Sequence, residues 1–269
     1  MTMLERLVHA AHEGVAARQG LVSAVELEAR LSARDKDRPF SEALVRPGLS
    51  LIAEFKRRSP TAGDIAMETN LATQIGGYSR GGAAAVSVLT ETPHFGGSLD
   101  DLRLARQVCD LPLLRKDFIV DPYQLIEAAV FGADAVLLIM AVLDDDDLRE
   151  LYLKAKELDL DCIVEVRTEA ELDRALMVDV DVIGINNRSF PDEGLVALET
   201  TFKLLPSVPA GKTVVAESGI SKLEELEDLE RIGVDAVLVG EALMRAEDAE
   251  ELTRQFSRVD QGTREHQLP

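Results

Sequence analysis

The chain has 269 residues, 46% of them apolar and 29% charged, which is enough to bury one large core and suits an α/β barrel that forms one domain. Its 29 Lys and Arg residues are outnumbered by 49 Asp and Glu residues, so the formal net charge is −20. Because such a surface repels phosphate backbones and anionic lipid headgroups, we expect no nucleic-acid or membrane partner.

The two cysteines, Cys109 and Cys162, lie in separate apolar segments and have no CxxC partner. This usage is typical of small buried thiols in a reducing compartment. No basic segment followed by an apolar run opens the chain, and no apolar stretch approaches the roughly 18 residues of a membrane-spanning helix. We therefore expect a cytoplasmic protein.

The first part of the chain, residues 1–48, is predicted to be a helical extension. Residues 3–31 are rich in Ala, Glu and Arg and carry apolar residues at helical spacing, so they predict one helix. A polar segment follows, from Ser32 to a turn at Pro47 and Gly48.

After this turn, short apolar runs alternate with amphipathic helical segments. The apolar runs, eight in number, predict strands at residues 49–55, 84–89, 113–115, 135–139, 162–166, 182–185, 213–216 and 236–239. Helical segments between them include residues 99–109, 122–131, 145–158, 169–178 and 222–232.

Two nearly identical phrases, GADAVLL at residues 132–138 and GVDAVLV at residues 233–239, indicate a repeated βα unit. Eight such units favour an α/β fold of the (β/α)8 TIM barrel type. The main alternative is a doubly wound sheet, which usually has fewer strands and whose GxGxxG turn is missing here. We expect a single domain, with the barrel at residues 49–258 and a polar tail at 259–269.

Charged and amide side chains follow several of the predicted strands. In a barrel, the carboxyl ends of the strands form the active site, although strand ends are also where solvent begins. Glu54 and Lys56 are two residues apart, so they face the same side of a strand. The other strand ends carry Lys116 between Arg115 and Asp117, Glu165, Asn186 with Asn187 and Arg188, and Glu217 before Ser218.

The last two strands lead into glycine turns, ESGIS at residues 217–221 and VGEALM at residues 239–244. Gly219 and Gly240 would let backbone N–H groups approach an anion at helix N-termini, and this is the usual phosphate site of the fold. The basic segment 57–64, RRSPTAGD, is predicted to be a mobile loop that could cover an anionic ligand.

The histidines His9, His12, His94 and His266 are scattered without metal-ligand spacing. No Ser-His-Asp triad is recognisable either. We therefore expect chemistry that depends on Lys, Glu and Asn, with no metal.

In order along the chain, these motifs resemble the indole-3-glycerol phosphate synthase family of tryptophan biosynthesis. The phrases that carry the resemblance are IAEFKRRSPTAGDI, VLTETPHFGGSLDDL, LLRKDFIVDPYQ, GADAVLLI, IVEVRTEAEL, IGINNRSF, VAESGI and VLVGEALMR. The resemblance implies a lyase, a carboxy-lyase that needs no cofactor. It would close the pyrrole ring of 1-(2-carboxyphenylamino)-1-deoxyribulose 5-phosphate, with loss of carbon dioxide and water.

The resemblance also implies roles for the strand-end residues. Lys116 would be the general acid that protonates the substrate carbonyl, and Glu165 would be the acid and base of the later dehydration. Lys56, paired with Glu54, is an alternative proton donor in the dehydration. Asn186 and Glu217 would orient and stabilise the intermediates.

The implied substrate contacts fall into three groups. Arg188, Ser59 and Lys56 would hold the anthranilate carboxylate. The phosphate would be held by Ser218, Gly219, Gly240 and the backbone N–H of Glu241. The apolar walls would be Phe95, Phe118, Leu137 and Leu238.

Three further expectations concern charge. Lys116 among other cations should have a lowered pKa. Lys56, Arg57, Arg58, Lys116 and Arg188 should form a positive mouth on an acidic protein. Glu241 should turn its carboxylate away from the phosphate. Ser189 and Phe190 depart from the family's usual NNRDL phrase.

Two other functions remain open from the sequence. One is another phosphate-binding barrel such as a phosphoribosyl isomerase, although the Cys/Asp or Asp/Asp pair of such enzymes is absent. The other is a non-catalytic barrel within a synthase assembly. The expected partner is a small phosphorylated substrate, and the expected state is a monomer, with a homodimer as the alternative.

Overall fold

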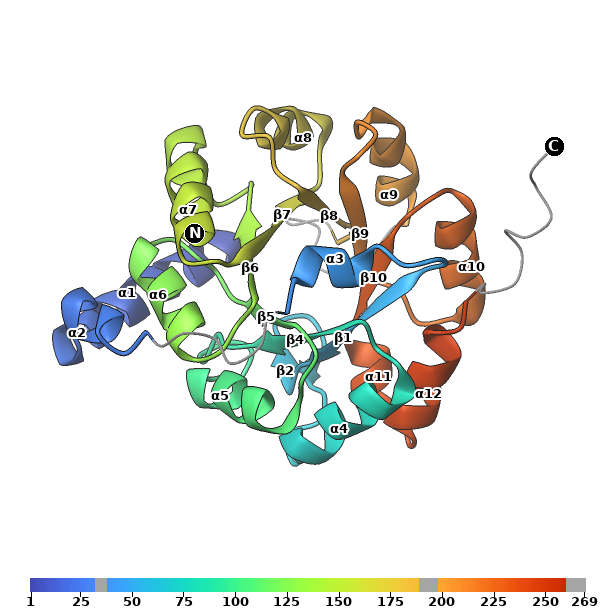
Figure 1. Cartoon of the computed structure of the whole chain (residues 1–269), viewed down its shortest axis with the longest axis horizontal. Helices are drawn as coiled ribbons and strands as arrows, with labels where there is room; N and C mark the ends of the chain where they lie inside the picture. Colours follow the sequence, from blue (N-terminus) through green and yellow to red (C-terminus); the bar gives the residue numbers. More distant parts are fainter. Residues whose placement is uncertain (32–37, 189–197, 260–269) are drawn as a thin grey trace.

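The computed structural model describes residues 1–31, 38–188 and 198–259 (Figure 1). Eight parallel strands close into a barrel in the order β1-β10-β9-β8-β7-β6-β5-β4. This confirms the predicted (β/α)8 barrel and rules out the doubly wound sheet, which is open. The barrel strands are β1 (Ser50–Phe55), β4 (Ala85–Leu89), β5 (Leu113–Lys116), β6 (Ala135–Ile139), β7 (Asp161–Val166), β8 (Val182–Asn186), β9 (Thr213–Glu217) and β10 (Ala236–Val239).

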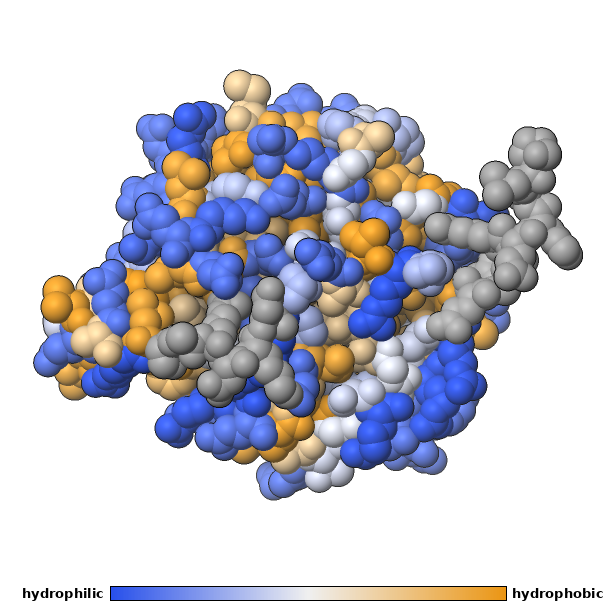
Figure 2. All heavy atoms as spheres, viewed as in Figure 1, coloured by the Kyte–Doolittle hydropathy of each residue, from blue (hydrophilic) through white to orange (hydrophobic). Residues whose placement is uncertain are grey.

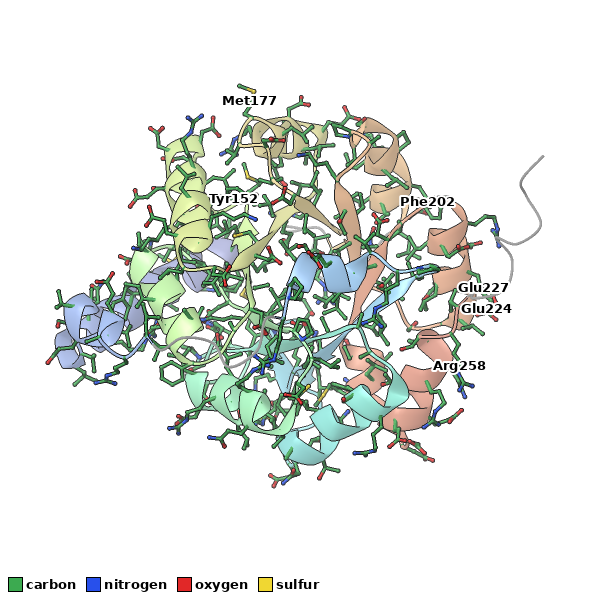
Figure 3. The ribbon with its side chains drawn as sticks, viewed as in Figure 1. Tyr152, Met177, Phe202, Glu224, Glu227 and Arg258 are labelled. Carbon is green, nitrogen blue, oxygen red and sulfur yellow. The ribbon has the colours of Figure 1, made fainter. Side chains whose placement is uncertain are left out.

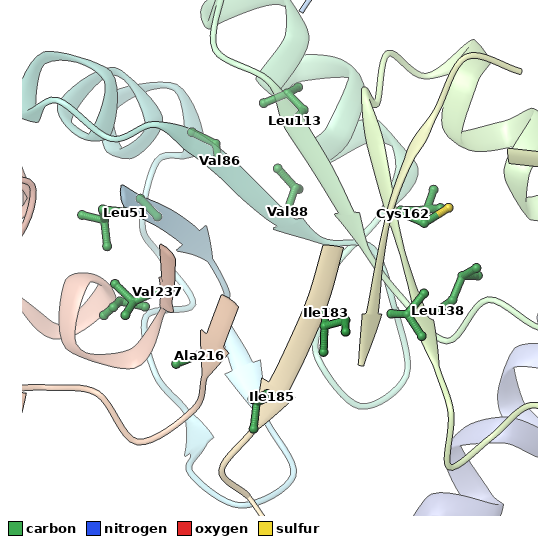
Figure 4. Close-up of a cluster of buried hydrophobic side chains, with 14 of the residues drawn as sticks. Leu51, Val86, Val88, Leu113, Leu138, Cys162, Ile183, Ile185, Ala216 and Val237 are labelled. Carbon is green, nitrogen blue, oxygen red and sulfur yellow. The ribbon is translucent and has the colours of Figure 1, made fainter. Parts of the chain in front are cut away.

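Successive side chains of each strand point alternately into the barrel and out toward the helices. Leu51, Val86 and Leu138 belong to the outer layer, between strands and helices (Figure 4). Ile52 and Leu137 belong to a separate cluster inside the ring. Because both faces of each strand are buried, the strands appear in the sequence as continuous apolar runs, which is why their positions were predictable.

Helices form the outer ring of the molecule (Figure 1). Their outward faces are mainly hydrophilic in the view of Figure 2, as with Glu224 and Glu227 of α10, which project from the periphery in Figure 3. These helices are α4 (Leu71–Gly81), α5 (Leu99–Val108), α6 (Pro122–Val130), α7 (Asp145–Glu157), α8 (Glu169–Leu176), α9 (Glu199–Leu204), the 3-10 turn η1 (Leu205–Ser207), α10 (Leu223–Arg231), α11 (Glu241–Arg245) and α12 (Ala249–Phe256).

The two repeated phrases form equivalent units. Gly132 follows α6 with φ 91° and Gly233 follows α10 with φ 94°. Both conformations favour glycine, which ends the helix and directs the chain into β6 or β10. These strands are four positions apart in the closed ring, so the repeats lie on opposite sides of the barrel.

The prediction of one helix over residues 3–31 is wrong. The segment forms α1 (Met3–Leu21) and α2 (Ala24–Glu28), which are separated at Val22 and Ser23. The Ser23 hydroxyl accepts a hydrogen bond from the Glu26 backbone N–H at 3.3 Å, and the Glu26 carboxylate accepts one from the Ser23 N–H at 2.9 Å. This capping box starts a new helix where the periodicity alone suggests continuation.

A short helix, α3 (Phe40–Leu44), lies within the segment that was predicted to be merely polar. Phe40 and Leu44 are fully buried and pack with Ile52 of β1 inside the ring. In Figure 1, α3 lies across the barrel opening nearest the viewer. It closes the end of the barrel where β1 begins. Residues 32–37 of this segment, and residues 260–269 of the predicted tail, lie outside the described residues.

The segment after β1, predicted to be a mobile loop, contains a small antiparallel hairpin of β2 (Arg58–Ser59) and β3 (Gly63–Asp64). None of the helices in the described parts of the chain combines the length and apolar character that crossing a membrane requires.

Candidate active site

The carboxyl ends of the barrel strands surround a cavity of about 490 Å³, a size typical of small-molecule sites. Every predicted site residue except Glu217 lines it. Glu217 is fully buried and is hydrogen-bonded to Lys116. The structure therefore brings together residues from β1, β5, β7, β8, β9 and β10, which are far apart in sequence.

Glu54 and Lys56 project from the end of β1 as an ion pair, with 2.8 Å between Lys56 Nζ and Glu54 Oε1. The other carboxylate oxygen of Glu54 is 3.9 Å from Lys116 Nζ. Burial by itself would raise the pKa of Glu54, but Lys56 and Lys116 outweigh this effect and keep the pKa below its usual value. Glu54 is thus a carboxylate shared by two lysines.

Lys116, at the end of β5, donates a hydrogen bond to Glu217 Oε2. The expectation of a lowered pKa for Lys116 is wrong. Burial acts in that direction, but the carboxylates of Glu217, Glu54 and Glu165 surround the ammonium group and raise its pKa. The neighbours that matter come from β9, β1 and β7, and they are anions.

Glu217 shows the opposite response to the same surroundings. Burial raises its pKa to about 7, Glu165 and Glu54 add to the rise, and Lys116 opposes it. Within the described part of the chain, its Oε1 is buried without a hydrogen-bond partner. Glu217 can therefore exchange a proton with its neighbours near neutral pH.

Two glycines leave room for these carboxylates. A Cβ on Gly184 of β8 would collide with Glu217 Oε1 and approach Ile163 Cγ2 to 2.7 Å. A Cβ on Gly240 would collide with Glu54 Oε1. Close approach of side chains to the backbone explains the glycine at both positions.

Aromatic and aliphatic side chains form the walls of the cavity. The rings of Phe95 and Phe118 lie 6.3 Å apart between centroids at an interplanar angle of 44°. Leu137 of β6 and Leu238 of β10 also line it. Such a wall suits a planar aromatic ligand.

Polar groups gather at the ends of β8 and of the β2–β3 hairpin. The Asn186 side-chain oxygen accepts a hydrogen bond from the Arg188 N–H at 2.9 Å, and the Arg188 guanidinium donates one to the Thr61 hydroxyl. Ser59 is buried and accepts a hydrogen bond from the Ala62 N–H at 3.0 Å. The hairpin and Arg188 thus meet at the mouth of the cavity.

Ser189 and Phe190, the positions that depart from the usual phrase, lie outside the described residues.

The turns after β9 and β10 form another side of the cavity. Ser218 and Gly219 have left-handed backbones, with φ 68° and 80°. For a serine this conformation costs about 1 kcal/mol or more, and it is characteristic of binding sites. The Glu241 carboxylate pairs with Arg245 Nε at 3.0 Å, which offsets its negative charge.

The predicted positive mouth needs correction. Arg57 forms a two-point ion pair with Asp101, at 2.8 and 2.9 Å, and stacks on Phe55. Arg58 pairs with Asp64 at 2.6 Å. Neither lines the cavity. Asp101, the partner of Arg57, is 44 residues away in sequence, and Asp64, the partner of Arg58, lies on the opposite strand of the hairpin.

Some residues that line the cavity were missed, among them Arg167, Arg245 and Leu4. Arg167 is two residues after Glu165, so strand alternation could have placed it on the same side. Arg245 is the last residue of α11, one helical turn beyond Glu241. Leu4 comes from α1, and no local signal indicates that this helix reaches the site.

In the described ranges, no three His, Cys, Asp or Glu side chains lie close enough to hold a metal ion.

Comparison with known proteins identifies the family. The family model described as indole-3-glycerol phosphate synthase matches residues 4–256. A protein of that name from Nocardioides sp. is 44% identical over 97% of this chain and 100% of its own length. The one from Lachnospira eligens is 47% identical over 82% of this chain and 83% of its own. The one from Bordetella pertussis is 44% identical over 91% and 95%.

Two solved structures share the fold at low identity. Thiamine phosphate pyrophosphorylase from Pyrococcus furiosus has a TM-score of 0.59 and 21% identity, covering 78% of this chain and 95% of its own. KGPDC from Streptococcus mutans has a TM-score of 0.56 and 15% identity, covering 77% and 95%. The fold is thus widespread, whereas the family model spans nearly the whole chain, and the curated relatives are more than 40% identical to it over the aligned residues. The chain belongs to the indole-3-glycerol phosphate synthase family.

Proposed function

We propose that this chain carries out the ring closure of its family with Lys116 as the general acid. The reaction converts 1-(2-carboxyphenylamino)-1-deoxyribulose 5-phosphate to indole-3-glycerol phosphate, with loss of carbon dioxide and then water. The observation that carries the assignment is the position of Lys116 Nζ, in the cavity, bonded to Glu217 and close to Glu54.

Lys116 acts first in this scheme. The surrounding carboxylates keep it protonated before the substrate binds, because they raise its pKa. It gives its proton to the substrate carbonyl as the ring carbon attacks. Glu217, with its pKa raised to about 7, returns a proton to Lys116.

The dehydration uses the other side of the site. Glu165 acts as acid and base, and Lys56, held by Glu54 at 2.8 Å, is a second proton donor. Asn186, whose side-chain oxygen holds the Arg188 backbone, orients the intermediate. Carboxylate and ammonium groups together in one cavity suit a reaction with successive proton transfers.

The substrate is held at its two charged ends. Arg188, Ser59 and Lys56 bind the anthranilate carboxylate. The phosphate is bound by Ser218, Gly219, Gly240 and the Glu241 N–H. The phosphate thereby supplies binding energy away from the reacting atoms.

The apolar walls hold the aromatic ring. Phe95, Phe118, Leu137 and Leu238 form a slot that aligns the two carbons to be joined. The same slot excludes water from the ring as carbon dioxide leaves.

The test is direct, because the chain contains no Trp and its own fluorescence does not mask an indole product. Purified protein is mixed with the substrate, and indole fluorescence is followed. Product formation supports the proposal. No product from protein with an intact circular dichroism spectrum would contradict it.

We further propose that the chain works as a cytoplasmic monomer. Each residue assigned a role above comes from one chain, and both cysteines are buried free thiols. Sedimentation analysis at assay concentration tests the monomer. A dimer at that concentration would show the proposal to be wrong.

A further inference from the structure

Arg115 is a fully buried cation directly before Lys116. Its side chain points out of the barrel toward α6, and it is 1% exposed. Its Nε donates to the Thr90 hydroxyl at 3.1 Å, and its Nη1 donates to the Gln124 carbonyl at 2.6 Å. Asp117 and Glu127 accept from Nη2 at 2.9 and 3.3 Å. A buried guanidinium requires such partners, so this arrangement is rigid.

The segment after Lys116 is held by side chains because the strand pairing stops. The β5–β6 ladder ends at Arg115, and the β4–β5 ladder ends at Lys116, which pairs with Leu89. Beyond it, the Asp117 carboxylate accepts the Phe118 N–H at 2.9 Å, and Gln124 donates to the Phe118 carbonyl at 2.9 Å. The Thr90 N–H donates to the Lys116 carbonyl at 3.1 Å, and the Thr90 hydroxyl donates to Asp117 at 2.5 Å. The backbone of Lys116 is thus paired with β4, and the backbone of Phe118 shortly after it depends on the side chains of Asp117 and Gln124.

Glu127 links this network to the N-terminal helix. It lies on α6, its side chain is 3% exposed, and Arg18 of α1 donates to its two oxygens at 2.5 and 3.1 Å. Among the described residues, Oε1 of Glu127 accepts a hydrogen bond from Arg18 alone. The result is a continuous chain, Arg18–Glu127–Arg115–Asp117, with two cations and two anions in alternation.

We propose that Arg18 is a positioning residue for the reaction, because through Glu127, Arg115 and Asp117 it fixes the backbone directly after Lys116, including that of Phe118. Without Arg18, Glu127 loses one of its two guanidinium partners and depends on Arg115, which also donates to Asp117. The guanidinium then shifts toward Glu127 and releases Asp117. The N-terminal extension thus acts on the active site from outside the barrel.

The test replaces Arg18 by Met, which keeps the length of the side chain and removes its charge. We expect kcat to fall about tenfold with a smaller change in KM, since a small displacement of the acid affects chemistry more than binding. Arg18→Lys should recover part of kcat, because it restores the charge without the two-point geometry. Arg6→Met, on the exposed start of the same helix, should leave kcat unchanged.

A second variant separates the proposed positioning role of Arg18 from a general weakening of the contact between the N-terminal helices and α6. Tyr123 of α6 donates a hydrogen bond to the Val22 carbonyl at 3.0 Å, so Tyr123→Phe weakens the attachment of the extension without touching the charged chain. We expect it to lower the unfolding temperature while kcat stays within twofold. An equal loss of kcat in Tyr123→Phe and Arg18→Met, or a normal kcat in Arg18→Met, would overturn the proposal.

The inference rests on Lys116 as the acid of the proposed function, and the two can fail separately. If Lys116→Met abolishes turnover and Arg18→Met does not reduce it, only the positioning role is wrong. If Lys116→Met is active, the assignment of the acid is wrong, whatever Arg18→Met does.

Discussion

Lys116 of β5 and Glu217 of β9 form a buried hydrogen-bonded pair, 101 residues apart in sequence, in which the second carboxylate oxygen of Glu217 has no partner among the described residues. The pair combines a lysine whose pKa is raised with a glutamic acid whose pKa is raised to about 7. The proton between them therefore stays on Lys116, while Glu217 can take up or release a further proton near neutral pH. This relationship leads to the first two predictions.

Replacing Lys116 by Met should lower kcat by about 10²- to 10⁴-fold, the usual contribution of a general acid. The fold should persist, because Glu217 can become protonated when its cation is removed. Indole fluorescence measures the rate, and circular dichroism confirms the fold. Lys203→Met is the matched control, since Lys203 is 71% exposed on α9. Near-normal turnover in Lys116→Met would transfer the acid role to another group, with Lys56 the first candidate.

The proton on Glu217 should make stability depend on pH. Its pKa is raised from 4.5 to about 7 in the folded chain, so the folded state holds a proton that the unfolded state has lost between these values. This contribution is complete below pH 4.5 and disappears as the pH rises through 7. Urea unfolding measures the free energy of unfolding of the unsubstituted protein and of Glu217→Gln. Between pH 5 and pH 7, this free energy should fall in the unsubstituted protein relative to Glu217→Gln, which has no proton to lose at this position. If the unfolding free energies of the two proteins change with pH in parallel, the raised pKa of Glu217 would be contradicted.

Arg188→Met should raise KM about 10- to 100-fold with a smaller effect on kcat. A charge-assisted hydrogen bond to the substrate carboxylate is worth about 1.5–3 kcal/mol. Steady-state kinetics with the full substrate provides the measurement. Arg58→Met is the control, because Arg58 pairs with Asp64 and does not line the cavity. Equal effects of the two substitutions on KM would indicate a general charge effect. The proposed contact between Arg188 and the substrate carboxylate would then be wrong.

Gly184→Ala should lower both stability and turnover. The added Cβ would collide with Glu217 Oε1 and lie 2.7 Å from Ile163 Cγ2, and forced overpacking of this kind costs about 1–3 kcal/mol. Displacement of Glu217 from Lys116 should reduce kcat about tenfold or more.

Gly20→Ala is the matched control for Gly184→Ala. Gly20 lies in α1, and no heavy atom lies within 4 Å of the position that an alanine Cβ would take, so the substitution should stabilise the chain by up to about 1 kcal/mol. Thermal unfolding and kcat are measured for both variants. A Gly184→Ala protein with normal kcat would show that the Glu217 position tolerates the extra methyl group.

The parts of the fold that local pattern dictates were predictable. The barrel strands appear as apolar runs because both of their faces are buried, and the predicted bounds agree with the structure to within one residue. The short helix α3 was not predictable, since Phe40 and Leu44 find their apolar surroundings inside the ring of strands. The division between α1 and α2 was visible in principle, as Ser23 and Glu26 form a capping box.

The candidate site likewise contains residues that the sequence could predict and residues that it could not. Residues at strand ends were predictable because a barrel brings those ends together. The contribution of Leu4 was not, because it depends on how α1 packs against the barrel mouth.

The sequence by itself determined the order of strands and helices, the residues at the strand ends, and a motif set characteristic of one family. Only the tertiary structure decided the charge state of those residues. Lys116 was expected among cations, but Glu54, Glu165 and Glu217 reach it from three other strands and raise its pKa. Arg57 and Arg58 were expected at the mouth, but Asp101 and Asp64 bind them elsewhere. The physical reason is that electrostatic energy depends on distance in space, which the closure of the barrel sets.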